Sequence, residues 1–350
     1  MRSAVLRGGS MVVRDDVPEP VPAEGQVLVE VLACGICGSD LHFARHGGTM
    51  IDLASRMTGV PSAGPQDDPW FRTEPGSDVF MGHEFSARVL EAGPRTDALP
   101  AGTVVTSVPA MVLPGGVRDL AYGNHLPGGY SERMLLSAPL LLEVPNGLDP
   151  RHAALTEPMA VGLHAVNKAD LVPGDGAVVL GCGPVGLAVI AALRLRGVEP
   201  IVASDLSPAR RALAATMGAH EVVDPRDEPA FEAWRRVGGA ASMVTFEAVG
   251  IPGMLDAVLR DAPAQSRVVV VGVCMQPDTV TPFFAIAKEL RLQFVLAYGL
   301  EEFGESLRAI AEGEIDVAPL VTGEVDLDGV PGAFDALADP EEHCKILVVP

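Results

Sequence analysis

The sequence predicts an α/β chain of two domains, a small β-barrel and a doubly wound parallel sheet. The chain has 350 residues, which is more than one hydrophobic core usually serves. Up to about residue 150, short β-prone runs alternate with glycine and proline. After Pro150, apolar strands alternate with Ala/Leu-rich helical stretches, which is the pattern of βαβ units and a parallel sheet.

The change of pattern near residue 150 sets the expected domain boundaries. We expect residues 1–150 and 298–350 to form the barrel domain, and residues 151–297 to form the doubly wound domain. Strands of the barrel are predicted at 27–32, 87–90 and 103–106, and strands of the parallel sheet at 177–180, 201–204, 243–246 and 268–271.

Composition limits the class of partner and the compartment. A net charge of -21 and a pI of about 4.7 would repel phosphate backbones and anionic lipid, so neither a nucleic acid nor a membrane partner is expected. No apolar run approaches the roughly 18 residues of a membrane span, and the first residues lack a secretory signal. We therefore expect a cytoplasmic protein. Its five scattered cysteines argue against a disulfide framework, so metal binding or burial must explain them.

A glycine-rich turn follows the first strand of the doubly wound region. The letters G-C-G-P-V-G at 181–186 lie between the predicted strand and a helical stretch, which is the setting that a dinucleotide-binding fingerprint requires. Gly181 would permit the tight turn, Gly183 would let the backbone approach a pyrophosphate, and Gly186 would let the helix pack closely on the strand. Pro184 stands at the first helical position, where a missing N–H costs least.

An acidic residue completes the fingerprint. Asp205 ends the second strand about 20 residues after Gly186, where a carboxylate accepts from the ribose hydroxyls of NAD and repels the 2′-phosphate of NADP. Arg210 and Arg211 leave NADP open, because a nearby arginine accommodates that phosphate. The alternative interpretation is a glycine-rich turn with a helix-capping aspartate ahead of Ser207.

A short segment near the N-terminus concentrates groups that bind metals and carry protons. Residues 34–42 include two thiols, a hydroxyl, a carboxylate and an imidazole, from Cys34, Cys37, Ser39, Asp40 and His42. A C-x-x-C pair also occurs in zinc ribbons and redox sites, but no second pair follows and the segment lies in a β region. His83 and Glu84 add an imidazole and a carboxylate. One thiolate, one imidazole and one carboxylate, with a position left for substrate, are what catalytic zinc needs.

Four ordered motifs now point to a family. They are C-G-I-C-G-S-D-x-H at 34–42, G-H-E at 82–84, E-P-M-A-V-G-L-H at 157–164 and G-x-G-P-V-G at 181–186. In that order the chain resembles the zinc-dependent medium-chain dehydrogenases, in the branch with sorbitol, threonine and glucose dehydrogenases. The resemblance spans nearly the whole chain. It implies a GroES-like catalytic domain interrupted by a Rossmann domain.

The resemblance also implies residue roles. Cys37 rather than Cys34 is the expected zinc thiolate, His83 the imidazole ligand, and Glu84 and Glu157 the carboxylates that bind zinc or its water. Zinc would make an alcohol hydroxyl more acidic, as it does bound water. Ser39 would take the hydroxyl proton, His42 would pass it towards solvent, and Asp40 would orient His83.

Cofactor and assembly follow from the same resemblance. NAD and one catalytic zinc per chain are expected, without a structural zinc, because no cysteine lies between Cys37 and Cys182. A homodimer or homotetramer is expected, with the apolar strand at 292–297 as a possible subunit edge. Besides the glycines and Asp205, the candidate cofactor-binding residues are Pro184, Val185, Arg210, Val249, Val273 and Tyr298.

Two departures bear on the substrate. Residues 47–78 read as an insertion with a short amphipathic helix at 47–57, followed by Trp70 and Phe71; it is either a surface elaboration or a cover over the substrate cleft. Sorbitol dehydrogenases carry a tyrosine after the motif histidine and an arginine before the tyrosine near the nicotinamide. Phe43 and Ala297 occupy those places, and buried hydroxyls left unpaired cost about 1–3 kcal/mol each.

The sequence therefore predicts reversible oxidation of an alcohol to a ketone or aldehyde by zinc and NAD. A fairly apolar secondary or aromatic alcohol is the expected substrate. One alternative is a polyol or sugar dehydrogenase with the same machinery. Another is a nucleotide-binding protein without catalysis, because a fold by itself does not define a function.

Overall fold

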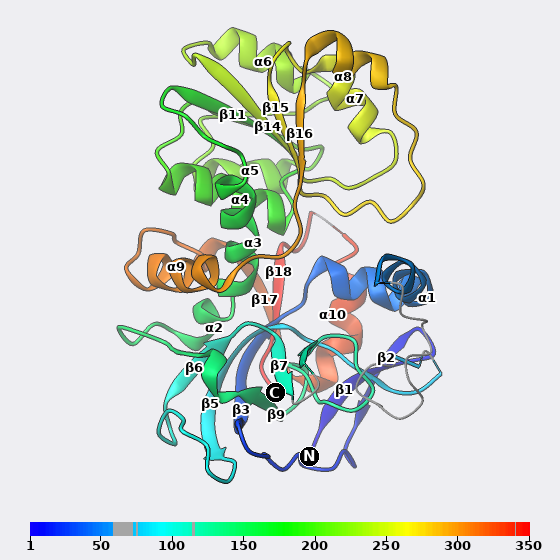
Figure 1. Cartoon of the computed structure of the whole chain (residues 1–350), viewed down its shortest axis with the longest axis vertical. Helices are drawn as coiled ribbons and strands as arrows, with labels where there is room; N and C mark the ends of the chain where they lie inside the picture. Colours follow the sequence, from blue (N-terminus) through cyan, green and yellow to red (C-terminus); the bar gives the residue numbers. More distant parts are fainter. Residues whose placement is uncertain (59–72, 75, 114–115, 340) are drawn as a thin grey trace. The chain divides into compact units, whose positions relative to one another are not determined.

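The computed structural model describes residues 1–58, 73–74, 76–113, 116–339 and 341–350 (Figure 1). Two compact units account for the chain. Unit 1 comprises Met1–Glu157, Val321–Asp339 and Lys345–Pro350, and unit 2 comprises Pro158–Leu320 and Pro340–Cys344. Within the described residues, no helix has the length and apolar character that would carry it across a bilayer.

A long central strand, β3 (Gln26–Gly35), organises unit 1. It pairs antiparallel with β5, β9 and β18 in a seven-stranded sheet, and a smaller sheet has the order β2-β1-β4. The other strands of this unit are β1 (Ser3–Arg7), β2 (Ser10–Arg14), β4 (Val79–Phe80), β5 (Glu84–Ala92), β6 (Val104–Ser107), β7 (Ala110–Leu113), β8 (Gly116–Asp119), β9 (Arg133–Ser137), β10 (Leu141–Glu143), β17 (Val321–Val325) and β18 (Lys345–Val348).

The register of β3 determines which residues meet at its end. Gly35 lies opposite Glu84 of β5 and also opposite Leu347 of β18. Segments from three distant parts of the sequence therefore converge where β3 stops. The core beside this point contains Phe85, Tyr130 and Met134, each at most 1% exposed. Because these large side chains fill the interior between the strands, the end of β3 is held rigidly.

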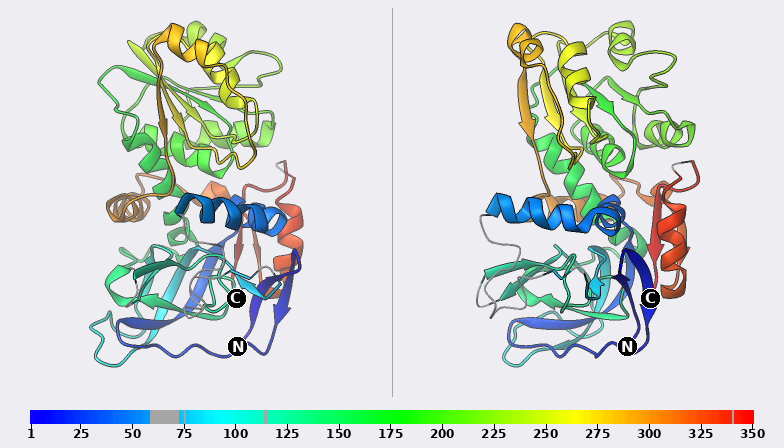
Figure 2. Two further views of the ribbon diagram at one scale, coloured as in Figure 1. Left: turned by 45° about the vertical axis from the view of Figure 1, so that its right-hand side comes forward. Right: turned by 90° about the vertical axis from the view of Figure 1, so that its right-hand side faces the viewer.

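The helices of unit 1 are α1 (Gly38–Thr58), α2 (Pro150–Ala153) and α10 (Val330–Ala336), with 3₁₀ turns at Ala138–Leu140 and Leu327–Gly329. Helix α10 lies beside β2 (Figure 2). The helix expected at 47–57 is part of α1, which bends at His46. Met50 and Ile51 pack partly buried against the core of unit 1, whereas Leu53 is exposed. Trp70 and Phe71 lie outside the described residues.

Unit 2 is built on a six-stranded sheet in the order β13-β12-β11-β14-β15-β16, and every pairing is parallel. Its strands are β11 (Asp175–Leu180), β12 (Ile201–Ser204), β13 (Glu221–Val223), β14 (Ser242–Glu247), β15 (Arg267–Val270) and β16 (Arg291–Phe294). Helices α6 and α7 cover the sheet face that carries Val178 and Leu180. Strand order reverses between β12 and β14, around β11, where doubly wound folds bind ligands.

The helices associated with unit 2 are α3 (Thr156–Asn167), α4 (Pro184–Leu195), α5 (Pro208–Met217), α6 (Ala230–Val237), α7 (Met254–Asp261), α8 (Pro282–Lys288) and α9 (Leu300–Ala311), with a 3₁₀ turn at Ala318–Leu320. Unit 2 continues past residue 297 to Leu320 because α9 is fastened to it. Glu302 of α9 bonds to His164, and Glu305 pairs with Arg196. The α/β class expected from the sequence, a GroES-like domain with a Rossmann domain, is confirmed.

Candidate active site

Three potential metal ligands converge at the end of β3. The ligand atoms of Cys37, His83 and Glu84 all lie within 4.8 Å of one another. Cys37 lies between β3 and α1, and His83 directly precedes β5, so the register of Gly35 with Glu84 brings the three together. His83 is 8% exposed and Glu84 is fully buried. A thiolate, an imidazole and a carboxylate at this spacing fit catalytic zinc.

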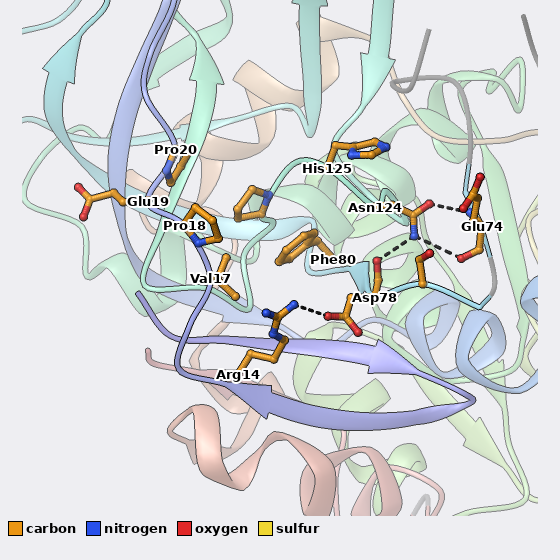
Figure 3. Close-up of a pocket in the computed structure, with 12 residues that line it drawn as sticks. Arg14, Val17, Pro18, Glu19, Pro20, Glu74, Asp78, Phe80, Asn124 and His125 are labelled. Atoms are coloured by element: carbon orange, nitrogen blue, oxygen red, sulfur yellow. Dashed lines mark hydrogen bonds and ion pairs between the residues drawn. The ribbon is translucent and has the colours of Figure 1, made fainter. Parts of the chain in front are cut away.

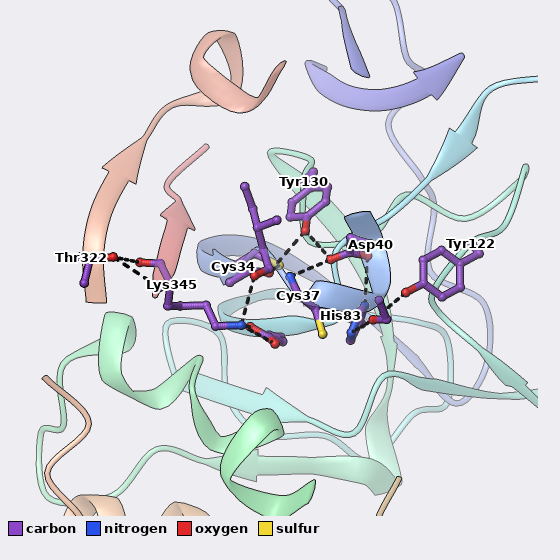
Figure 4. Close-up of polar contacts among 12 residues, drawn as sticks. Cys34, Cys37, Asp40, His83, Tyr122, Tyr130, Thr322 and Lys345 are labelled. Carbon is purple, nitrogen blue, oxygen red and sulfur yellow. Dashed lines mark hydrogen bonds and ion pairs between the residues drawn. The ribbon is translucent and has the colours of Figure 1, made fainter. Parts of the chain in front are cut away.

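A buried carboxylate orients the histidine (Figure 4). Asp40 Oδ2 accepts hydrogen bonds from Tyr130 Oη at 2.6 Å and from the Cys37 N–H at 3.0 Å. Its other oxygen lies 3.4 Å from His83 Nδ1. This contact is an ion pair without a hydrogen bond among the described residues. Because the carboxylate faces Nδ1, Nε2 is left for a metal.

Asp40 and His83 each shift the pKa of the other. Burial alone would raise the pKa of Asp40, but the His83 charge and the bonds from Tyr130 and Cys37 hold that pKa below its ordinary value. Burial would lower the pKa of His83, but Asp40 and Cys37 raise it well above the usual range. Burial and the Asp40 charge raise the pKa of Tyr130, so its phenol stays neutral and donates.

Cys34 is close in sequence but differs in environment. It is fully buried, and burial together with the Asp40 charge raises the pKa of its thiol well above the ordinary value. A Cβ at Gly129 would lie 2.4 Å from Cys34 Sγ, so this side chain is packed against backbone. Because zinc binds the thiolate, Cys37 is the better ligand of the pair.

Sequence reasoning missed a lysine that meets one of the carboxylates. Lys345 Nζ lies 2.7 Å from both oxygens of Glu84 and donates to the Ile36 carbonyl at 3.1 Å. Lys345 is 2% exposed. A Cβ at Gly35 would fall 2.0 Å from Glu84 Oε2, so the glycine makes room for the pair. The only signal in the sequence is a lysine at the start of the apolar C-terminal run K-I-L-V.

Ser39 lies beside the metal-ligating group, which is Cys37, His83 and Glu84. Its aromatic neighbour Tyr122 was not predicted from the sequence. Tyr122 Oη donates to Ser39 Oγ at 2.9 Å, and Ser39 Oγ is 3.4 Å from His83 Nε2. Burial raises the pKa of the Tyr122 phenol well above its ordinary value, as do the negative charges of Asp40, Cys37 and Glu157. Tyr122 therefore stays protonated and donates.

The remaining proposed catalytic residues lie at the edge of this group. His42 follows Ser39 by one turn of α1 and is exposed. Its pKa is lowered by partial burial and by the neighbouring His46 and Arg45 charges. Glu157, in the first turn of α3, is half-buried. Its ligand atom is outside the group of three, although its charge reaches Tyr122.

In unit 2 the three glycines of the fingerprint have different surroundings. Gly181 has φ +91° and packs against Val249, whose Cγ2 would lie 2.9 Å from a Cβ there. A Cβ at Gly186 would lie 1.9 Å from the Gly181 carbonyl oxygen, so α4 sits directly on the turn. At Gly183 a Cβ would meet nothing within 4 Å. Pro184 opens α4, followed by Val185. The open side of the turn is therefore at Gly183, where a pyrophosphate would approach.

The acidic residue is anchored to the same turn. Asp205 accepts from the Cys182 N–H at 2.7 Å and from the Ser207 N–H at 2.8 Å. Arg211 donates to the Asp205 carbonyl and to Asp224 Oδ2, which directs its charge to Asp224. Arg210 Nε is buried and has no hydrogen-bond partner among the described residues.

Two further cofactor candidates are accessible at the surface of unit 2. Val249 is 37% exposed and Val273 is 58% exposed. Tyr298 is half-buried, and its ring centroid lies 5.6 Å from that of Phe303. These three residues stay predictions from the sequence.

A separate pocket of unit 1 has a volume of about 660 Å³ and is bordered by Arg14, Phe80, Asn124 and His125 (Figure 3). None of the zinc ligands expected from the sequence lines it. Asn124 Nδ2 donates to the Asp78 carbonyl at 2.8 Å. The pocket wall thus anchors the loop that carries Tyr122.

The fold and the site together define a zinc-type dehydrogenase with a nicotinamide cofactor. Residues 23–146 match the alcohol dehydrogenase GroES-like domain, and residues 184–312 match the zinc-binding dehydrogenase domain. The chain belongs to the zinc-dependent medium-chain dehydrogenase family. It is an enzyme that transfers a hydride between an alcohol and a nicotinamide cofactor, which confirms the activity expected from the sequence.

Individual relatives are similar along the whole chain. An (R,R)-butanediol dehydrogenase of Bacillus subtilis (strain 168) is 33% identical over 350 residues, 96% of either chain. A sorbitol dehydrogenase of the same organism is 26% identical over 367 residues, covering 100% of this chain and 97% of the other. Among solved structures, 2R,3R-butanediol dehydrogenase from B. subtilis has a TM-score of 0.84 at 31% identity, with 100% of both chains covered.

A second solved structure extends the comparison to cofactors. A putative zinc-binding dehydrogenase from Sinorhizobium meliloti 1021, bound to NADP, has a TM-score of 0.82 at 28% identity and covers 100% of this chain and 99% of its own.

The chemistry divides between the metal and the protein. When bound, zinc supplies a positive charge that makes an alcohol hydroxyl more acidic and polarises the product carbonyl. Asp40, which accepts from Tyr130, faces the His83 ring, and the Ser39 hydroxyl lies beside His83, where the sequence predicts that it meets the reacting oxygen. Small-molecule alcohols fit this arrangement as substrates.

Zinc content distinguishes the two cysteines of the motif. Cys37→Ala removes a ligand and should lower zinc far below the expected one ion per chain. Cys34→Ala removes a buried thiol of the same size and should leave zinc unchanged. Elemental analysis after dialysis measures both variants beside the parent. Two ions per chain in the parent, or equal loss in the two variants, would contradict the assignment.

The two glycines offer a matched pair for the cofactor. Gly183→Ala should fold with an unchanged Tm but weaken NADH binding by about tenfold or more, about 1.4 kcal/mol, because the methyl group enters the open side of the turn. Gly186→Ala should destabilise the protein by about 1–3 kcal/mol through overpacking. Calorimetry and NADH fluorescence titration separate these effects. A lower Tm in Gly183→Ala would show that the added methyl group clashes with the protein, and would contradict an open side of the turn at Gly183.

Proposed function

We propose that the chain oxidises a small secondary alcohol with an apolar body to its ketone, with NAD as the hydride acceptor. The observation that carries this proposal is the aromatic wall beside Ser39. Phe43 and Tyr122 stack with ring centroids 4.3 Å apart and an interplanar angle of 10°. Phe43 is buried and Tyr122 packs against it, so the apolar face beside Ser39 offers few polar partners and favours substrates with short apolar groups on the reacting carbon.

The names of the relatives add alcohols with more than one hydroxyl to the candidates. Butanediol is a secondary alcohol with apolar ends, which agrees with the aromatic wall. A long polyol, as the sorbitol dehydrogenase name implies, needs more hydrogen-bond partners. Phe43 has none to offer, and Ala297 replaces the arginine expected in polyol enzymes. A polyol substrate is therefore the second candidate.

NAD is the proposed cofactor rather than NADP. Asp205 places a carboxylate at the end of β12, where it would repel a 2′-phosphate. Arg211 is engaged by Asp224 and by backbone carbonyls, so it supplies less charge for that phosphate. The S. meliloti relative binds NADP, and Arg210 is the residue here that would favour it.

We assign the carboxylate ligand of zinc to Glu157, with Glu84 as an occasional ligand. Both oxygens of Glu84 are already paired with Lys345 at 2.7 Å, and separating a buried ion pair is strongly unfavourable. Glu157 lies close enough for its charge to reach Tyr122. Glu157→Gln should then lower zinc affinity more than Glu84→Gln.

We also assign proton transfer to Ser39 and His42.

A homodimer or homotetramer and a cytoplasmic location complete the proposal. Every residue of the edge strand β16 is exposed, and Phe294 and Leu296 are 61% and 72% exposed. An uncovered apolar edge strand favours pairing with a second subunit. Sedimentation analysis of the parent and Phe294→Asp tests whether this strand forms the subunit contact.

All five cysteines are free thiols, in keeping with a reducing compartment.

The activity is tested by following NADH formation with the zinc-loaded protein and butan-2-ol, butane-2,3-diol, benzyl alcohol and sorbitol. The two butane substrates should give the highest kcat/KM. A higher kcat/KM for sorbitol would favour the polyol alternative. If none is oxidised while zinc and NADH bind, the non-catalytic alternative gains support.

Cofactor preference is tested at Asp205. The parent should have a larger kcat/KM with NAD than with NADP. In Asp205→Ser the ratio of the two should fall by roughly tenfold or more, because like charges brought together cost several kcal/mol. A parent that works better with NADP would overturn the carboxylate argument.

A further inference from the structure

The stacked ring pair beside Ser39 carries a hydroxyl that the sequence comparison with polyol enzymes did not foresee. Phe43 lacks the phenol oxygen that sorbitol dehydrogenases have after the motif histidine. Tyr122, from the distant segment between β8 and β9, lies face to face with Phe43 and directs its Oη to Ser39 Oγ at 2.9 Å. A phenol oxygen is thus present beside Ser39 although its side chain comes from another segment.

The backbone holds Tyr122 in an unusual conformation. Its φ is +61°, in the left-handed region that residues other than glycine rarely adopt. Such a conformation persists where the surroundings over-determine it. Thr73 Oγ1 donates to the Tyr122 carbonyl at 2.5 Å, and the Phe80 N–H donates to the Gly123 carbonyl at 2.7 Å. Asn124 is bonded to Asp78 in the same wall (Figure 3).

The ring is fixed as firmly as its backbone. One face of Tyr122 is covered by Phe43, and its ring lies edge-on to His83 with centroids 5.9 Å apart. The phenol oxygen therefore has one defined position, beside both Ser39 and the metal-ligating group (Figure 4). A side chain held in this way supplies a hydrogen-bonding group with little loss of entropy on binding.

The spacing of two oxygen atoms suggests what this group recognises. Ser39 Oγ and Tyr122 Oη are 2.9 Å apart. The two oxygens of a vicinal diol in its gauche form are separated by about one O···O hydrogen-bond length. A substrate oxygen at Ser39 therefore places the oxygen on the next carbon at Tyr122. The phenol donates its proton to Ser39 and keeps lone pairs that accept from a second hydroxyl.

We propose that Tyr122 is a specificity-determining residue, whose phenol oxygen accepts a hydrogen bond from the hydroxyl next to the one that is oxidised. The preferred substrate is then a short vicinal diol, and the corresponding α-hydroxyketone in the reverse direction. This inference rests on the proposed oxidation of a small secondary alcohol. Phe43 is buried in the core of unit 1, where it stacks on the Tyr122 ring and offers no further hydrogen-bonding group, so one extra hydroxyl is matched and a longer polyol is not.

Tyr122→Phe tests the proposal because it removes only the hydroxyl and keeps the ring that stacks on Phe43. Butane-2,3-diol and butan-2-ol form a matched substrate pair that differs by the second hydroxyl. In the variant, kcat/KM for the diol should fall roughly 10–100-fold, chiefly through KM, since a buried hydroxyl loses its partner. The value for butan-2-ol should fall by a smaller factor, because losing the bond to Ser39 affects both substrates whereas losing the contact with the second hydroxyl affects only the diol. The ratio of the two kcat/KM values should therefore fall about tenfold or more.

A binding measurement without turnover gives a second readout. For the zinc-loaded parent without NAD, the diol should raise Tm more than butan-2-ol does at the same concentration, because tighter binding stabilises the folded state more. Tyr122→Phe should abolish that difference while zinc content and the ligand-free Tm stay the same. Phe43→Leu, which keeps the phenol but removes its stacking partner, should lose part of the preference for the diol.

The outcomes separate this inference from the proposed function. A parent that oxidises butan-2-ol as well as the diol overturns the role of Tyr122 and leaves the proposed function intact. Equal losses for both substrates in Tyr122→Phe would show that Tyr122 only positions Ser39, and would also overturn the inference. A zinc-loaded parent that oxidises neither substrate would overturn the proposed function and the inference together.

Discussion

The catalytic unit depends on one buried negative charge. Asp40 has no exposed surface, so its carboxylate must be satisfied within the protein. Its Oδ2 accepts hydrogen bonds from Tyr130 and from the backbone of Cys37, and its Oδ1 makes an ion-pair contact with His83 at 3.4 Å. These partners come from three separate segments, so one ionised group fixes the path of the metal-binding loop and the orientation of its histidine.

A second buried charge is balanced in a different way. Glu84 meets Lys345, a residue of the last strand, at the end of β3. Removing two charges from water is costly, so a buried ion pair is weak evidence for stability. Its position beside the metal-ligating group suggests that the pair is retained for function. The lysine holds both oxygens of this carboxylate beside the expected metal ligands, so the carboxylate is not free to bind tightly.

The dinucleotide-binding turn and the metal site could be predicted from the sequence to different degrees. The glycine turn is local: strand, turn and helix follow one another, and Gly186 packs on the Gly181 carbonyl within that one segment, although Gly181 also packs against Ala248 and Val249 after β14. Cys37, His83 and Glu84 were predicted through an ordered set of motifs, and the register of β3 with β5 explains why they meet. Lys345 and Tyr122 were not predicted, because neither stands within a motif.

By itself the sequence determined the class of fold and the glycine turn, and it predicted the candidate metal ligands, because each is carried by a short local motif or by a pattern of regular spacing. Only the tertiary structure decided which side chains stand around those groups. Tyr122 stacks on Phe43 from another segment and brings its phenol oxygen to Ser39, and Lys345 reaches Glu84 through strand pairing. Such partners are set by sheet register and packing, which bring together residues far apart in the sequence and leave no local pattern to read.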